Sequence, residues 1–227
     1  KSSHDGIFGF GWGSDYEVYL TIAADGSVVA HENGGGAQNR FVPPSINPEE
    51  VDKAVEDMMA IKVKTGAGLS GSLAKSEKER LRNDARYRND EWEKLYDKGL
   101  VKPRQLAEGT VLKSNKFSFQ TINKSKDGYV RRFDNGQVQT FDNRGKLIRI
   151  ADKNGNFVNI SYDKAGHIAM MQDNLNRKLN FKFNSGGKVE SVSAEGGKTV
   201  TYKYTGVELV YAKDSDGMEY EYKYSNN

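Results

Sequence analysis

Hydrophobic and polar positions alternate along the second half of the chain, which predicts β-strands. Apolar side chains recur at every second residue in the pairs Leu179/Phe181, Val200/Tyr202 and Tyr220/Tyr222. A period of two places these side chains on one face of a strand. Short runs rich in Asp, Asn and Gly separate the strands, so the pattern predicts hairpins joined by tight turns.

A repeat of 21 residues organises these strands. Its first residues are Phe141, Tyr162, Phe183 and Tyr204, and Tyr224 follows after only 20 residues. Each unit contains two turns and two strands, which makes one hairpin per unit. A single hairpin cannot bury its apolar face, so we expect the hairpins to stack into one continuous antiparallel sheet. The residue missing from the fourth unit is expected in its first turn, near Gly206.

The turns carry the polar signature of the repeat. Asp and Asn accept hydrogen bonds from their own backbone two residues on, and Gly takes the left-handed conformation that follows. Asn176 replaces Gly in one second turn, and Asn tolerates this conformation best after Gly. The expected structural positions are Phe141, Asp142, Gly145, Gly155, Tyr162, Asp163, Gly166, Phe183, Gly187, Gly197, Tyr204, Gly217 and Tyr224.

The repeated YDKAGHI…D pattern, with its turn glycines, resembles the YD repeats of RHS proteins and teneurins. The resemblance runs from about residue 129 to 227, over four units in register. The departures are modest: Phe replaces Tyr twice, Asn184 and Thr205 replace the first Asp, and Ala194 replaces the second.

The first 44 residues predict a lead-in of hairpins. Val18, Leu20 and Ile22 alternate on one face, and an Asp25–Gly26 turn follows. Before them stands a short motif that resembles the segment that introduces RHS cores, because it precedes a strand and a DGS hairpin. Its residues are Phe8, Gly9, Gly11 and Trp12. A phosphate-binding loop is the alternative for these glycines, but neither a helix pattern nor a P-loop lysine follows them.

Residues 45–110 predict a helical insertion. Asn47 can cap a helix that begins at Pro48, and Val55, Met58 and Met59 share one face of it. Residues 66–72 predict a linker, and Ser76 to Glu79 a capping box with Leu73 and Leu81 as apolar contacts. Trp92, Leu95 and Tyr96 predict a further helical segment that ends at Gly99.

Residues 111–227 are then expected to form the YD-repeat sheet. Strands are predicted within 111–121 and 129–141, with a turn at Asn135–Gly136. The fold class is therefore mainly β: an antiparallel sheet of stacked hairpins, an open piece of a β-shell, with a small helical insertion.

Composition and charge narrow the functional classes. The 34 basic and 31 acidic residues are scattered, which gives no electrostatic case for nucleic acid. The pairs Arg131/Arg132 and Lys124/Lys126 are interpreted as solvated strand faces. The absence of Cys excludes thiol chemistry and disulfides, and no apolar run reaches the length of a membrane span.

Few residues suggest catalysis or metal binding. His4, His31 and His167 lack a second ligand at a metal-binding spacing. A carboxylate pair could come from Glu77, Glu79, Glu91 and Glu93, but a solvated charged helix face explains them better. The turn residues Asp142, Asp152, Asp163, Asp173, Asp214 and Asp216 raise the question of calcium binding. The turns that begin at Asp152 and Asp214 resemble calcium loops superficially, but they lack the downstream bidentate Glu, and turn chemistry explains them. We expect no enzyme activity, no cofactor and no metal.

The resemblance implies a segment of a larger secreted or surface bacterial protein whose repeats form a shell. Further repeats or a C-terminal cargo domain, such as a toxin, are the implied partners. Comparable repeats in teneurins serve adhesion. The alternative is a binding module that recognises a cell-surface glycan or protein through exposed aromatic side chains. A scaffold predicts aromatic rows between neighbouring repeats and an unpaired strand near residues 219–224.

Overall fold

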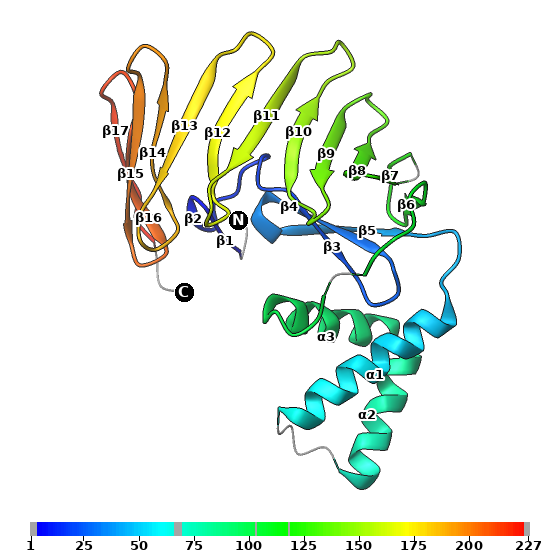
Figure 1. Ribbon diagram of the computed structural model, residues 1–227. Coiled ribbons are helices and arrows are strands. Elements are labelled where there is room, and N and C mark those ends of the chain that lie inside the picture. The colour runs from blue at the N-terminus through cyan, green and yellow to red at the C-terminus, as the bar shows by residue number, and fades with distance from the viewer. Residues whose placement is uncertain (1–3, 66–69, 103, 118, 225–227) are drawn as a thin grey trace. The chain divides into compact units, whose positions relative to one another are not determined.

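The computed structural model describes residues 4–65, 70–102, 104–117 and 119–224, and its fold is mainly β (Figure 1). Within these ranges, fifteen strands form one antiparallel sheet in the order β17 to β3, and β1 (Asp5–Gly6) pairs with β2 (Gly9–Phe10). Three α-helices accompany the strands in the same ranges. This architecture confirms the expected class, an antiparallel sheet of hairpins with a small helical part.

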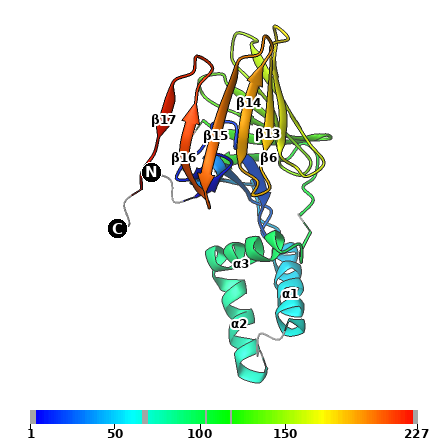
Figure 2. The same ribbon diagram turned by 90° about the vertical axis from the view of Figure 1, so that its left-hand side faces the viewer.

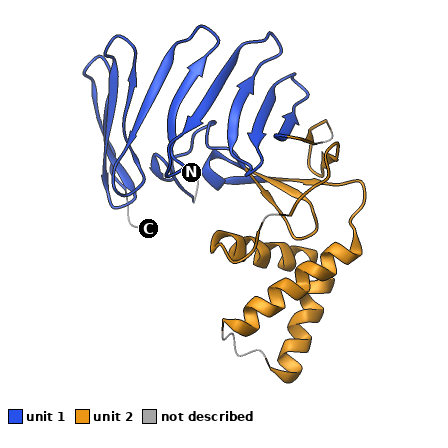
Figure 3. Ribbon diagram, viewed as in Figure 1, with its two compact units in different colours: residues 1–19, 31–38, 127–227 blue, residues 20–30, 39–126 orange. Residues whose placement is uncertain are grey.

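The chain divides into two compact units (Figure 3). The first contains residues 1–19, 31–38 and 127–227, and the second contains residues 20–30 and 39–126. The strands of the first unit from β8 onward are β8 (Gly128–Arg132), β9 (Val138–Asp142), β10 (Leu147–Ala151), β11 (Phe157–Tyr162), β12 (Ile168–Asp173), β13 (Lys178–Phe183), β14 (Val189–Ala194), β15 (Thr199–Thr205), β16 (Glu208–Lys213) and β17 (Glu219–Glu221).

The turns of the repeat have the geometry that their sequence predicts. In the second turn of the first repeat, Asp152 N–H donates to Asn156 O at 2.9 Å and Gly155 N–H to Asp152 O at 3.3 Å. The Asp152 carboxylate also accepts from Asn154 N–H and Asn156 N–H. Asn176 takes φ of 64°, as expected for the turn in which Asn replaces Gly. The glycines of the repeat with positive φ are Gly145, Gly155, Gly166, Gly187, Gly196, Gly197, Gly206 and Gly217.

The fourth repeat is shortened in its first turn, as predicted. Thr205 pairs directly with Glu208, so two residues, Gly206 and Val207, make this turn. In the first repeat, by contrast, Asp142 N–H donates to Lys146 O across three intervening residues. One residue fewer closes the hairpin without disturbing the pairing of β15 with β16.

Tyrosine side chains link one repeat to the next. The Tyr162 hydroxyl donates to Leu147 O at 2.7 Å, the Tyr204 hydroxyl to Val189 O at 2.8 Å, and the Tyr224 hydroxyl to Leu209 O at 2.8 Å. In each case the acceptor lies 15 residues earlier, near the start of the first strand of the preceding unit. Burial of Tyr162 and Tyr204 raises the pKa of their hydroxyls well above the ordinary value. The aromatic positions therefore hold neighbouring hairpins together.

The second unit contains β3 (Tyr19–Ile22) from Leu20 onward, part of β4 (Val28–Glu32), β5 (Ala37–Val42) from Asn39 onward, and β6 (Val111–Ser114) and β7 (Thr121–Ser125). The predicted strand within 111–121 is shorter than expected. It ends at Ser114, whose hydroxyl accepts from Lys116 N–H and Phe117 N–H and so starts a turn. The chain then returns as β7, which pairs with β6 in antiparallel register.

The helices of this unit are α1 (Pro48–Lys64), α2 (Gly71–Asn83) and α3 (Ala85–Asp97). The Asn47 side chain caps α1 by accepting from Glu49 N–H, as predicted. Gly99 ends α3: its N–H donates to Tyr96 O while Leu100 N–H donates to Leu95 O, which is a Schellman motif.

Two predictions for α2 were wrong. The helix begins at Gly71, so Ser76 lies inside it and makes no capping box, and Leu73 is exposed rather than an apolar contact. No Pro interrupts residues 71–75, so the helix extends back to Ser70, which occupies the N-cap position without a side-chain capping hydrogen bond. Residues 71 and 72 of the predicted linker belong to α2, and residues 66–69 lie outside the described part of the chain.

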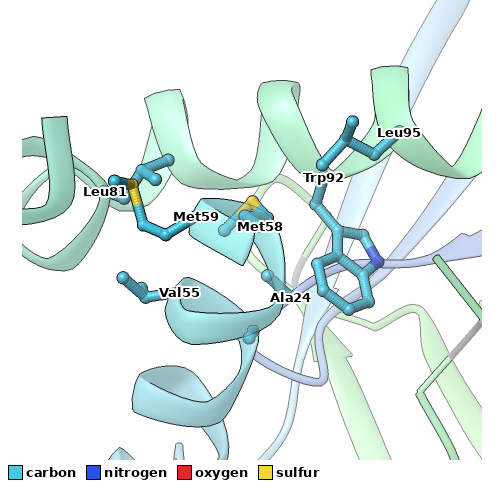
Figure 4. Close-up of a cluster of buried hydrophobic side chains, with 8 residues drawn as sticks. Ala24, Val55, Met58, Met59, Leu81, Trp92 and Leu95 are labelled. Atoms are coloured by element: carbon cyan, nitrogen blue, oxygen red, sulfur yellow. The ribbon is translucent and has the colours of Figure 1, made fainter. Parts of the chain in front are cut away.

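A small apolar core joins the three helices (Figure 4). It contains Ala54, Val55, Met58, Met59, Leu81, Trp92 and Leu95, together with Ala24 from the turn between β3 and β4. The adjoining Asp25 carboxylate accepts from Ser27 N–H at 3.0 Å, pairs with Arg40, and accepts from Asn89 of α3 at 3.3 Å. The predicted Asp25–Gly26 hairpin turn therefore also anchors the helices.

Candidate functional site

The N-terminal segment of the first unit lies along the starts of the repeat hairpins. Val189 N–H donates to Ile7 O at 2.9 Å, and Phe10 N–H donates to Val207 O at 2.7 Å. Figures 1 and 2 both show this dark blue segment, with β1 and β2, beside one end of the hairpin strands. Segments about 180 residues apart in sequence are thereby joined within one unit.

The motif residues Phe8 and Trp12 make ring contacts with the last repeats. The Phe8 ring meets Tyr202 edge to face, with centroids 5.3 Å apart. The Trp12 ring meets Tyr222 in the same way at 5.0 Å, and its indole N–H donates to the Tyr224 hydroxyl at 3.0 Å. The motif therefore packs against the hairpins rather than standing apart from them.

The motif glycines have a steric role. A Cβ added to Gly9 would lie 2.7 Å from Val207 O, and φ at this residue is 99°. Gly11 also has positive φ. The glycines thus let the backbone approach the hairpins and reverse direction between Phe8 and Trp12, which agrees with a packing role better than with a phosphate loop.

A polar cluster fastens the same segment. Lys188 Nζ lies 2.6 Å from Asp5 Oδ1 and donates to Gly6 O at 3.0 Å. The Glu17 carboxylate accepts from Ile7 N–H at 2.7 Å. Burial raises the pKa of Glu17, although this hydrogen bond and the nearby Lys188 charge oppose the shift.

An apolar groove of about 440 Å³ lies on the hairpin sheet next to the N-terminal segment. The N-terminal segment contributes Ile7, Phe8, Ser14 and Tyr16 to its lining. The hairpins contribute Met171, Leu179, Phe181, Val192, Ala194, Lys198, Val200, Tyr202 and Ser215. A second hollow of about 390 Å³ shares Tyr16, Met171, Leu179 and Ala194 with it. Such a surface can accept an apolar segment of another molecule or domain.

Several large apolar side chains of the first unit face solvent. Phe10, Trp12, Leu179, Met218 and Tyr220 are each more than a third exposed. The aromatic residues that open the repeats are instead buried or half-buried, with Phe141 fully buried. The first unit therefore has the aromatic rows between repeats that a scaffold predicts. It also has some of the exposed aromatic side chains that a binding module predicts.

No protein-family model and no curated protein matches the chain.

The three histidines have separate environments. The His31 ring is buried and stacks on Tyr19 with centroids 4.4 Å apart, and burial lowers its pKa to about 4. His167 stacks on Phe183 at 4.6 Å and faces Asp163 at 3.5 Å. His4 is exposed. Within the described residues, no three His, Asp or Glu side chains are grouped to hold a metal ion.

Two of the four candidate carboxylates are brought together, by a lysine. Lys62 Nζ of α1 pairs with Glu77 of α2 at 2.7 Å and with Glu91 of α3. Burial would raise the pKa of both carboxyls, but their hydrogen bonds to Lys62 lower it below the ordinary value. Glu79 is exposed, and burial raises the pKa of Glu93. The cluster joins three helices, which is a structural role.

The turn aspartates bind their own backbone. Asp142 accepts from Arg144 N–H and Lys146 N–H, Asp163 from His167 N–H, Asp173 from Leu175 N–H and Arg177 N–H, and Asp214 from Asp216 N–H and Met218 N–H. Asn184 makes the same pair of bonds to Gly186 N–H and Lys188 N–H. These hydrogen bonds agree with the turn role that was predicted for the repeat positions.

The interpretation of the basic pairs was wrong for two residues. Arg131 is almost fully buried, pairs with Glu32 at 2.6 Å and donates to Gln139 Oε1 at 3.3 Å. Lys124 is also buried and donates to Ser125 O. Arg132 and Lys126 are exposed, as expected. Arg131 and the buried Tyr129 are two residues apart in β8, so their side chains lie on the same face of the strand. The alternation in the sequence could have indicated that Arg131 is buried.

No helix in the described residues is both long and apolar enough to span a membrane.

Proposed function

We propose that this chain is a non-catalytic structural scaffold. It forms a segment of an RHS/YD-type shell that encloses or displays a cargo domain, such as a toxin, of a secreted or surface bacterial protein. The observation that carries this proposal is the series of tyrosine hydroxyls, each bonded to a carbonyl 15 residues earlier in the preceding hairpin. Such contacts join each unit to its neighbour and can continue for as many units as the chain provides.

The final strand supports the same proposal. All three residues of β17 are exposed, and β17 pairs with β16 through Tyr211 and Lys213. An exposed strand edge favours pairing with a further strand. The next hairpin of a longer repeat array is the partner that the geometry fits.

The charged clusters also favour a structural role. Lys62 and its two glutamates join helices, Asp25 and Arg40 anchor a hairpin, and Arg131 and Glu32 form a pair in the first unit. Each of these charged groups has an ion-pair partner within the fold. We therefore propose no catalytic role for them.

Isolation of the protein from its native cell tests the proposal. A shell segment predicts peptides that continue beyond residue 227 in the same polypeptide, and a part of that polypeptide that resists protease until the repeats are unfolded. A native mass equal to that of this chain, 25.3 kDa, would contradict the shell.

The exposed aromatic side chains of the first unit favour a second candidate, a binding module for a cell-surface glycan or protein. Trp12 and Tyr220 are the exposed aromatics to test, and Phe117 is a matched exposed aromatic in the other unit. A binding module predicts that Trp12→Ala or Tyr220→Ala abolishes attachment to target cells while Phe117→Ala does not. Equal attachment by all three folded variants would contradict it.

A further inference from the structure

Lys188 and Asp5 form an unusual ion pair. They lie 183 residues apart in sequence, yet Lys188 Nζ is 2.6 Å from Asp5 Oδ1. The Lys188 side chain is 9% exposed and the Asp5 side chain 41%, whereas Lys213 and Glu219, a surface pair of the same unit, are 46% and 54% exposed. The Asp5 carboxyl carbon is one C–O bond beyond Oδ1. The reacting atoms are therefore close to the separation of about 3–3.5 Å at which bond formation is favoured.

A third group adjoins the pair. Glu17 lies beside Gly6, and a Cβ on Gly6 would be 3.1 Å from Glu17 Oε1. The Gly6 carbonyl in turn accepts from Lys188 Nζ. Glu17 Oε2 is buried and has no hydrogen-bond partner among the residues that the structure describes. A carboxyl with a buried free oxygen and a raised pKa is suited to accept and donate protons.

We propose that Lys188 and Asp5 form an intramolecular amide bond, with Glu17 as the proton-transferring residue. The modification is independent of the proposed function, because it depends on contacts within the first unit alone.

The reaction balances without an external reagent. A proton passes from the Lys188 ammonium to the Asp5 carboxylate, which gives the amine that attacks and the acid that is attacked. The Nζ lone pair attacks Asp5 Cγ, and Glu17 takes the second proton from nitrogen and delivers it to the departing hydroxyl. One C–N bond forms, one C–O bond breaks, and one water molecule leaves.

The fold holds the Lys188 amine beside the Asp5 carboxyl, and this placement makes amide formation far more favourable than between free molecules in solution. Groups held in reactive geometry react with effective concentrations of about 10⁵–10⁸ M. The fold holds this geometry by hydrogen bonds on both sides of the pair, from Val189 N–H to Ile7 O and from Ile7 N–H to Glu17. The product would fasten the N-terminal segment covalently to the hairpin that carries Lys188.

Mass spectrometry of the folded chain tests the proposal. We expect an intact mass lower by one water molecule and, after digestion, a branched peptide that contains both Asp5 and Lys188. Asp5→Asn is expected to give the same branched peptide with loss of ammonia in place of water. Lys213 and Glu219, which lie 3.0 Å apart at the surface, serve as the internal control and should stay unlinked.

Two variants separate the chemistry from the fold. Lys188→Arg keeps the charge but cannot form the bond, so the full mass is expected. Glu17→Gln keeps the acceptor for Ile7 N–H and removes the titrating oxygen, so the bond is expected to form at least about tenfold more slowly in a chain with an unchanged circular dichroism spectrum.

Three results would overturn the proposal. The first is a folded chain that retains its full mass after prolonged incubation. The second is loss of water without a branched peptide, since Asp5 precedes Gly6 and can cyclise onto the backbone. The third is a branched peptide that forms equally fast in Glu17→Gln, which would remove the role of Glu17.

Discussion

Phe183 opens the third repeat, between the repeats that begin with Tyr162 and Tyr204. Unlike these two residues, it has no hydroxyl. Its counterparts Tyr162, Tyr204 and Tyr224 each bond a carbonyl 15 residues earlier. The equivalent acceptor for residue 183 is the carbonyl of Ile168, a buried residue at the start of β12. The link between the second and third repeats therefore depends on ring packing, including the stacked His167.

Phe183→Tyr is expected to restore this link and stabilise the protein by about 1 kcal/mol, the usual net value of one hydrogen bond. Chemical denaturation measures the change. Phe141→Tyr is the matched control: Phe141 is fully buried, so an added hydroxyl there should be destabilising. If Phe183→Tyr destabilises as much as Phe141→Tyr, the hydroxyl-to-carbonyl contact is not a general element of the repeat.

His31 gives the first unit a predictable dependence on pH. Burial lowers its pKa to about 4, from an ordinary value of about 6.5. The unfolded chain thus binds a proton more readily than the folded chain between these values, and stability falls as pH falls through this range. We expect a loss of about 2–3 kcal/mol between pH 7 and pH 4 from this residue alone.

His31→Phe keeps a ring to stack on Tyr19 and removes the titration. The free energy of unfolding of this variant should decrease less between pH 7 and pH 4 than that of the parent chain. An identical pH dependence in both proteins would show that His31 is accessible to protons in the folded state.

At the scale of elements, the hairpin turn that contains Asp25 holds the helical part of the second unit. Burial would raise the pKa of this carboxyl, but hydrogen bonds from Ser27 and the charge of Arg40 lower it below the ordinary value. Its contribution to stability is present above about pH 3.9, the value of the unfolded chain, and is lost as pH falls through the lower folded pKa.

Asp25→Ala is expected to destabilise the second unit by about 3 kcal/mol, because it leaves Arg40 and Asn89 without their shared acceptor. Thermal unfolding followed by Trp92 fluorescence measures this, since Trp92 belongs to the helix core. Asp216→Ala removes an exposed aspartate and should change stability by less than about 0.5 kcal/mol. Equal effects of the two substitutions would refute the anchoring role.

Elements with local signals could be predicted from the sequence. The hairpin turns, the start of α1 at Pro48 and the end of α3 at Gly99 depend on residues within one turn of each other. The start of α2 could not, because Ser76 and Glu79 satisfy a capping pattern that an earlier helix start overrides. The contact of Phe8 and Trp12 with the last hairpins joins residues near the two ends of the sequence, and no local pattern contains it.

At the scale of the whole chain, the repeats form an array of hairpins in which each unit is stabilised by the next. Stability in such arrays is approximately a sum over units and their interfaces. The last strand, β17, has three exposed residues and pairs with β16. Its stability should therefore depend on whether another unit follows.

The central claim is best tested by adding one repeat. Residues 163–183, joined directly after Tyr224, place a natural unit in register with the last aromatic position. The control is an added segment of the same composition in scrambled order. Hydrogen exchange of the β17 amides is the measurement.

We predict that the natural unit slows exchange at residues 219–221 at least about tenfold and itself becomes resistant to protease, while the scrambled segment does neither. If the natural unit stays protease-sensitive and the β17 amides exchange as before, the hairpins do not form an extendable scaffold.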